Sequence, residues 1–227
     1  MSSTDSVLGK AARRARSSDR FAVPREGLTL LAGIVGLMWL VEIVNAADGY
    51  ALSNDGIYSR SVSHLWGIFT SPFIHENFAP HLLDNTIPLV FLGVIIAWRG
   101  AVRLAVVTAI VIVLGGLGTW LIGPAGVSTI GASGVVFGYA TYLLTRGFFD
   151  RKLWEIATAV IVGAVWGATL LASLEPHKYI SWQGHLMGGV AGVVAAYATA
   201  SRDKRREDNG RRPLSRGERP AIGAPSK

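Results

Sequence analysis

Hydrophobic residues along the chain fall into long, nearly uncharged runs, not into short alternating ones. The runs cover residues 28–47, 82–97, 104–145, 156–174 and 180–201. About 20 such residues cross the hydrocarbon core of a bilayer as one helix, so the third run is long enough for two. The sequence Gly-Pro-Ala-Gly at 123–126 divides it into helices at about 104–122 and 130–147. The pattern predicts an all-α membrane protein with six transmembrane helices.

The rest of the chain forms polar tails around this core. We expect one six-helix domain at residues 27–201, between disordered basic segments at 1–26 and 202–227. The composition, 50% hydrophobic and only 16% charged, favours a membrane protein over a soluble domain. The chain has no cysteine, which excludes thiol nucleophiles, disulfides and thiolate metal sites.

Basic residues are divided very unevenly between the two ends of the predicted helices. Of the 22 lysines and arginines, only Arg60 and Lys178 fall in outer segments; the others lie in the tails and in two inner connections. The positive-inside rule then places both termini in the cytoplasm of a multi-pass cell-membrane protein. The net charge of +7 is therefore a membrane-orienting signal, and we expect the lipid bilayer, not nucleic acid, as a partner.

Polar side chains gather at one predicted depth. The second, fourth and sixth helices run in the same direction, and their first turns carry His81 with Asn85, Ser133 and His185 respectively. Such groups are costly to bury in a membrane, so they usually face the interior of the bundle and mark a functional site.

The fourth helix opens with Gly131-Ala-Ser133-Gly134. The glycines permit close backbone approach, and a serine at a helix start lies beside N–H groups that have no partner within the helix. This arrangement suits the binding of an oxyanion. The alternative interpretation is helix packing through small residues.

The sixth helix places His185 on nearly the same face as Gly188 and the glycine four residues further on. With Gly134 facing them from the fourth helix, the two helices can approach closely enough for Ser133 and His185 to meet. The alternative for His185 is a hydrogen-bonded structural residue.

His81 and Asn85 are four residues apart and share a helical face, so both could donate to the same oxyanion. The alternative is a polar clamp between helices. We also considered a metal site formed by His75, His81 and His185. It lacks a paired histidine spacing and a carboxylate ligand, so we expect no metal and no cofactor.

Together these segments resemble the rhomboid family of intramembrane serine proteases. His75, His81 and Asn85 resemble the pattern of its second helix, the segment around Ser133 its G-x-S-G fourth helix, and the segment from His185 its H-x-x-G-x-x-x-G sixth helix. The resemblance covers about residues 28–200 in order. It implies a rhomboid-like six-helix bundle.

The resemblance also implies residue roles. Ser133 would be the nucleophile and His185 the general base of a catalytic dyad, with His81, Asn85 and the Ser133 amide around the oxyanion. His75 would be a supporting, noncatalytic histidine.

Phe137 matches an aromatic residue that stacks on the base and is commonly tyrosine in this family. Two features depart from the pattern. The spacing from His75 to His81 is one residue longer, and the Trp-Arg pair of the first loop is missing, with Arg60 a loose counterpart.

The implied function is an endopeptidase that cleaves single-pass transmembrane proteins in or near their membrane helix through an acyl-enzyme. The alternatives are an inactive rhomboid-like protein that binds membrane clients, and a channel or transporter for small solutes. The sequence leaves the natural substrate, its cleavage site and the oligomeric state open.

Overall fold

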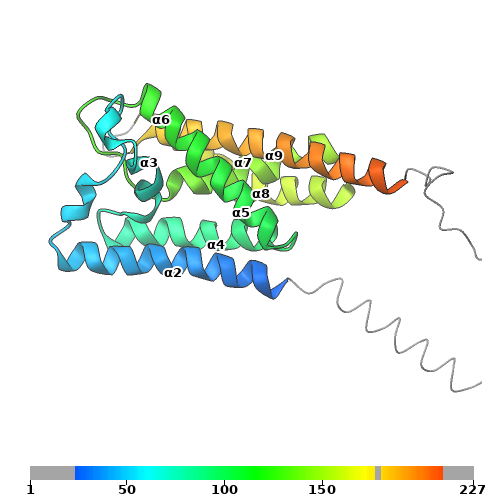
Figure 1. The fold of residues 1–227 in the computed structure, drawn as a ribbon, viewed down its shortest axis with the longest axis horizontal. Helices are drawn as coiled ribbons and strands as arrows, with labels where there is room; N and C mark the ends of the chain where they lie inside the picture. The colour runs from blue at the N-terminus through cyan, green and yellow to red at the C-terminus, as the bar shows by residue number, and fades with distance from the viewer. Residues whose placement is uncertain (1–23, 177–179, 212–227) are drawn as a thin grey trace, which may run out of the picture.

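A bundle of long helices makes up most of the protein (Figure 1). The computed structural model describes residues 24–176 and 180–211. The main helices in chain order are α2 (Arg25–Ala47), α4 (Leu83–Ala97), α5 (Ala101–Ile110), α6 (Gly116–Ile122), α7 (Ser133–Asp150), α8 (Leu153–Ala172) and α9 (Trp182–Arg211). The π-helical segment Val111–Gly115 joins α5 to α6 into one continuous element. The described helices therefore follow the six predicted apolar segments.

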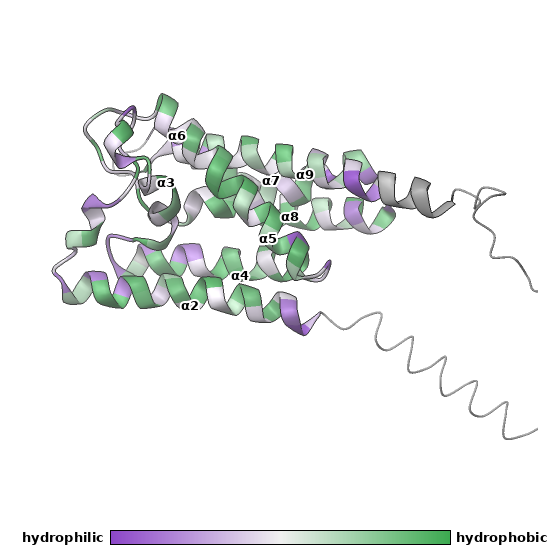
Figure 2. Cartoon of the chain, in the orientation of Figure 1, coloured by the Kyte–Doolittle hydropathy of each residue, from purple (hydrophilic) through white to green (hydrophobic). Residues whose placement is uncertain are grey.

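Hydrophobic residues predominate along the helices, and hydrophilic ones are more frequent toward the ends of the bundle (Figure 2). Among the described residues, α2, the continuous element Ala101–Ile122 and α8 are long and apolar enough to cross a membrane, whereas α4 is apolar but shorter. These helices indicate a membrane protein, and the count of six spans stays a prediction. In α7, ten residues are buried, because this helix packs against α4, α8 and α9.

Both ends of the bundle domain extend beyond the predicted boundaries. Helix α2 begins at Arg25, inside the segment predicted as a disordered tail at 1–26, because Pro24 suits a helix start and Glu26 complements its dipole. Helix α9 continues to Arg211, into the segment predicted as disordered at 202–227. Residues 202–211 are rich in helix-forming charged residues of both signs, which explains the extension. The rest of both predicted tails lies outside the described residues.

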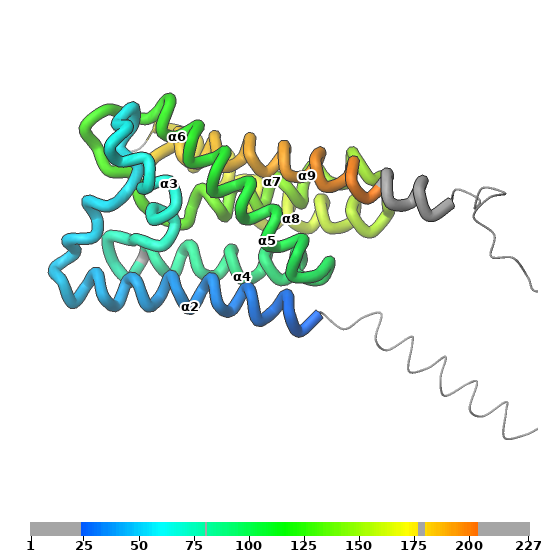
Figure 3. The backbone as a smooth tube through the Cα atoms, in the orientation of Figure 1, coloured from blue at the N-terminus to red at the C-terminus, as the bar shows by residue number. Residues whose placement is uncertain are grey.

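The segment between α2 and α4 is irregular and lies at one end of the bundle (Figure 3). It contains the short helix α3 (Gly67–Thr70), and an isolated β-bridge joins Ile57 to Thr129. The start of α2 and the end of the described part of α9 lie at the opposite end (Figures 1 and 3).

A kink precedes α4. The π-helical segment Phe78–Leu82 contains Ala79 in an extended conformation, with φ −135° and ψ 132°. The cause is Pro80, because a residue before proline is disfavoured in the helical region. Helical geometry resumes after the kink and carries His81 into the first turns before α4.

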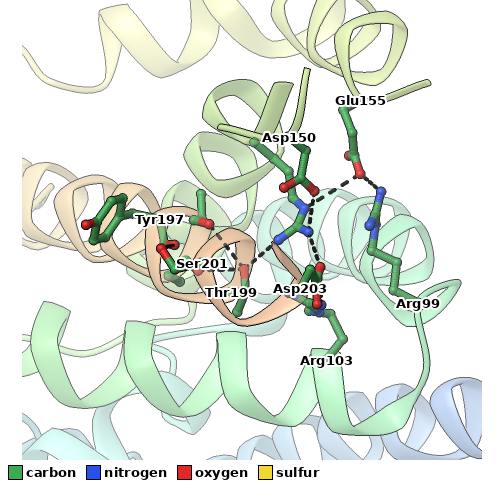
Figure 4. Close-up of polar contacts among 11 residues, drawn as sticks. Arg99, Arg103, Asp150, Glu155, Tyr197, Thr199, Ser201 and Asp203 are labelled. Atoms are coloured by element: carbon green, nitrogen blue, oxygen red, sulfur yellow. Dashed lines mark hydrogen bonds and ion pairs between the residues drawn. The ribbon is translucent and has the colours of Figure 1, made fainter. Parts of the chain in front are cut away.

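A cluster of charged side chains joins several helices (Figure 4). It includes residues beside the connection between α4 and α5, which lies at the end of the bundle away from the irregular segment (Figure 1). Arg146 of α7 is fully buried; its Nη2 donates to Asp150 at 2.5 Å and to Asp203 of α9 at 2.6 Å. Asp203 also accepts from Arg103 at 2.6 Å. Glu155 of α8 pairs with Arg99 and lies 3.6 Å from Arg146 Nε. We call these six residues the ionic cluster.

The ionic cluster changes the interpretation of one basic residue. From the distribution of basic residues, Arg146 is predicted to lie in the inner connection between the fourth and fifth helices. The structure instead places it within α7, buried among carboxylates. Arg146 shares Asp203 with Arg103 and Glu155 with Arg99, so it lies at the same end of the bundle as these two arginines. The predicted direction of the helices is therefore unchanged.

We expect Arg146→Ala to lower the free energy of unfolding by about 3–5 kcal/mol, because it leaves buried carboxylates without their counter-charge. The thermal midpoint of the detergent-solubilised protein measures this loss. Arg202→Ala is the matched control, since Arg202 is exposed and precedes Asp203 on the same helix. Equal effects of the two substitutions would contradict the assigned role of the ionic cluster.

Candidate active site

A cavity of about 1090 Å³ lies between the helices. It extends from α4 to α8 and reaches the starts of α7 and α9. All nine site residues predicted from the sequence line this cavity: His75, His81, Asn85, Gly131, Ser133, Gly134, Phe137, His185 and Gly188. The structure therefore brings together side chains that lie up to 110 positions apart in the chain.

Ser133 is the first residue of α7, where the first backbone N–H groups have no acceptor within the helix. The N–H groups of Val135 and Val136 donate to the carbonyl of Ala132 and start the helix. The N–H groups of Ser133 and Gly134 precede them and have no acceptor within the helix. Gly131 turns the chain into α7 with φ +109°, a conformation that favours glycine.

His185 is buried in the first turns of α9, and two contacts fix its ring. The imidazole stacks on Phe137, with centroids 4.2 Å apart and planes 7° from parallel. Its Nδ1 lies 2.9 Å from the carbonyl oxygen of Ser173, which follows α8. Because a carbonyl only accepts, Nδ1 carries the proton and Nε2 is the free basic nitrogen.

Asn85 and Ser133 border the same space. A methyl group placed on Gly131 would lie 4.0 Å from both Asn85 Nδ2 and Ser133 Oγ. The Asn85 amide also donates to the carbonyl of His81 at 2.9 Å. The ring of His81 is partly exposed, and its Nδ1 lies 3.9 Å from the Glu76 carboxylate. Asn85 therefore borders the space beside Ser133, whereas the His81 ring lies near Glu76.

His75 contacts the turn that precedes the serine. Its Nε2 accepts from the N–H of Ala132 at 3.2 Å. Burial lowers the pKa of His75 to about 4, so the ring is neutral at physiological pH and can accept this hydrogen bond. This hydrogen bond ties the irregular segment to the turn before Ser133, and the supporting role of His75 stays a prediction.

Glycines allow the backbones of α7 and α9 to touch. A Cβ on Gly188 would overlap the carbonyl oxygen of Gly134, and a Cβ on Gly192 would overlap that of Gly138. These two contacts repeat along the helices at the same four-residue interval. They hold the start of α7, with Ser133, against the start of α9, with His185.

Comparison with known proteins identifies the family of this chain. A profile described as "Rhomboid domain" matches residues 62–202, well over half of the chain. The chain belongs to the rhomboid family. The match begins after α2, so the first helix of this rhomboid protein lies outside it.

Several relatives cover most of the chain. An uncharacterized protein of Mycobacterium tuberculosis is 42% identical over 187 residues, which are 79% of this chain and 78% of the relative. An uncharacterized protein of Mycobacterium leprae is 40% identical, over 79% of this chain and 73% of the relative. A Bacillus subtilis protein named "Putative rhomboid protease YdcA" is 24% identical over 79% of this chain and 91% of its own length.

Several hydrogen bonds around the site were not predictable from the sequence. Nothing in the residue type signals that the carbonyl of Ser173 orients His185. Arg60, considered only as a loose counterpart of a loop motif, donates to the carbonyls of Leu121 and Gly123 and ties the irregular segment to the end of α6. Glu42 interrupts an apolar run, which was the only signal of its contact with His75.

We expect Gly188→Ala to displace α9 from α7, because its methyl group would overlap the Gly134 carbonyl. The substitution should lower the free energy of unfolding by about 1–3 kcal/mol, the usual cost of overpacking. Gly189→Ala is the control, since its methyl group would meet only Thr141 Cγ2 at 3.4 Å. Thermal midpoints measure both, and a larger loss for Gly189→Ala would contradict the assigned helix contact.

Proposed function

We propose that this rhomboid protein is an intramembrane serine endopeptidase that cleaves single-pass transmembrane proteins in or near their membrane helix. The observation that carries the proposal is the fixed imidazole of His185, which borders the same cavity as Ser133 and keeps Nε2 free. Family membership supports the same reaction class.

In the proposed reaction, the Ser133 hydroxyl gives its proton to His185 Nε2 while its oxygen attacks a substrate carbonyl carbon. Collapse of the tetrahedral intermediate breaks the C–N bond, and His185 returns the proton to the leaving amine. Water then hydrolyses the acyl-enzyme by the same base. The ring stacking on Phe137 and the hydrogen bond to Ser173 keep the base in the required tautomer and orientation.

The developing oxyanion would be stabilised by donors at the start of α7. The N–H groups of Ser133 and Gly134 are free of intrahelical acceptors, and the Asn85 amide has a second hydrogen to donate beyond its bond to His81. Preorganised donors of this kind usually supply the largest electrostatic part of catalysis. His81 is a further candidate donor from the cavity wall.

The proposed setting is the cell membrane, crossed six times with both termini in the cytoplasm. The distribution of lysine and arginine supports this orientation. So does the position of the two described chain ends at the same end of the bundle (Figure 1). The substrate helix must unwind locally at the cut, because a helical peptide hides its carbonyl groups in hydrogen bonds.

We expect Ser133→Ala and His185→Ala each to abolish labelling by a fluorophosphonate probe. The probe reacts when the Ser133 oxygen attacks its phosphorus atom, and His185 is the base that activates this oxygen. In-gel fluorescence of the purified proteins measures the labelling. Ser128→Ala is the control, since this serine also lines the cavity but its hydroxyl donates to the Ser53 carbonyl. Labelling that persists in Ser133→Ala would refute the nucleophile, and no labelling of the unsubstituted protein would favour a client-binding or transport function.

We expect Asn85→Ala to lower turnover by up to about 10²–10³-fold with little change in substrate affinity, as for the loss of one oxyanion donor. Turnover and KM are measured on a single-pass membrane substrate, together with the thermal midpoint. Thr86→Val is the neighbouring control on α4, where the hydroxyl contacts Trp39 and the Leu82 carbonyl. A lower midpoint with unchanged turnover would instead make Asn85 a polar clamp.

A further inference from the structure

Two polar side chains are fully buried in the second half of helix α2, which is otherwise apolar there. Glu42 and Asn45 are both 0% exposed. Burying such groups costs free energy unless hydrogen bonds replace those made to water. Their partners therefore indicate what these residues are for.

Both side chains bind the main chain of the same residue, His75. The N–H of His75 donates to Glu42 Oε2 at 3.2 Å, and Asn45 Nδ2 donates to the His75 carbonyl at 2.9 Å. The ring of His75 then accepts from the N–H of Ala132 at 3.2 Å. Ala132 immediately precedes Ser133, so hydrogen bonds through His75 link α2 to the residue just before α7.

Satisfying their own hydrogen bonds does not explain why Glu42 and Asn45 are polar. Within the described residues, Glu42 Oε1 and Asn45 Oδ1 are buried without a hydrogen-bond partner, so each residue keeps a cost that an apolar side chain would avoid. Neither residue lies in the part of the chain that the family profile matches, which begins at residue 62.

We propose that Glu42 and Asn45 are positioning residues that hold the turn before Ser133 in place through His75, a role in catalysis that rests on the proposed function above. Neither side chain lines the cavity, and neither would touch the substrate. They fix the main chain of His75, whose ring fixes the Ala132 amide and so the start of α7. The nucleophile then stays in register with His185.

Removing either contact to His75 should lower turnover with little loss of substrate affinity. Small displacements of a reacting group lower the rate steeply, by about 10²-fold for a 1 Å error. Glu42→Leu removes the acceptor at similar size, so the His75 main chain loses one of its two anchors. Glu42→Gln keeps an oxygen that can accept from the His75 N–H, and should restore the unsubstituted behaviour.

The first measurement is amide hydrogen exchange by mass spectrometry on a peptide covering residues 130–134, in the full-length detergent-solubilised protein. We expect exchange about tenfold faster in Glu42→Leu and Asn45→Leu, as for the loss of one hydrogen bond of ordinary strength, and near-normal exchange in Glu42→Gln. Leu31→Ala is the control on α2, since Leu31 is buried against Gly93, away from the His75 contacts. It should lower the thermal midpoint without changing exchange at 130–134.

The second measurement is turnover on a single-pass membrane substrate. Glu42→Leu should lower kcat by roughly 10–100-fold at nearly constant KM, and Glu42→Gln should recover it. The inference is overturned if Glu42→Leu lowers only the thermal midpoint, as Leu31→Ala does, or if exchange at residues 130–134 does not change. If the unsubstituted protein shows no Ser133-dependent turnover, the proposed function fails, and the exchange measurement still decides whether Glu42 holds the turn.

Discussion

The backbone contact between α7 and α9 determines which residues meet at the cavity. Gly188 lies so close to the Gly134 carbonyl that no larger residue fits, and Gly192 repeats the contact against Gly138 one turn further on. Between helices in lipid there is little hydrophobic driving force, so small residues that permit close packing determine which faces meet. This pairing brings Ser133 and His185 to the same cavity, since each lies at the start of its own helix.

The ionic cluster joins the same two helices at their other ends. Arg146 of α7 binds Asp203 of α9, and the cluster balances three arginines with three carboxylates. A net charge buried at this place would be costly, so the balance is a condition of burying Arg146 at all. Glycine contacts near the cavity and ion pairs beyond it together set the register of α7 against α9.

The helices and the site were predictable from sequence for different reasons. Long apolar runs locate helices directly, and the motifs around Ser133 and His185 locate the residues that line the cavity. The orienting carbonyl of Ser173 was not predictable, because every residue has a carbonyl and only the path of the chain selects one. Asp203 could not be assigned to Arg146 for a similar reason, since 57 residues separate them. The end of α9 was missed because a charged segment continues a helix as readily as it forms a tail.

In the proposed mechanism, Ser133 and His185 act without a carboxylate. The position of the ionic cluster, away from the cavity, explains why. A carboxylate beside His185 would add a buried charge at membrane depth, where it lacks the arginines that compensate the ionic cluster. The Ser173 carbonyl orients the imidazole without that charge, and Phe137 holds its plane. An imidazolium formed during catalysis would then be stabilised by the carbonyl dipole and by the oxyanion created in the same step. In the proposed mechanism, the Ser173 carbonyl, which has no donor within α8, would orient His185 in place of the third member of a triad.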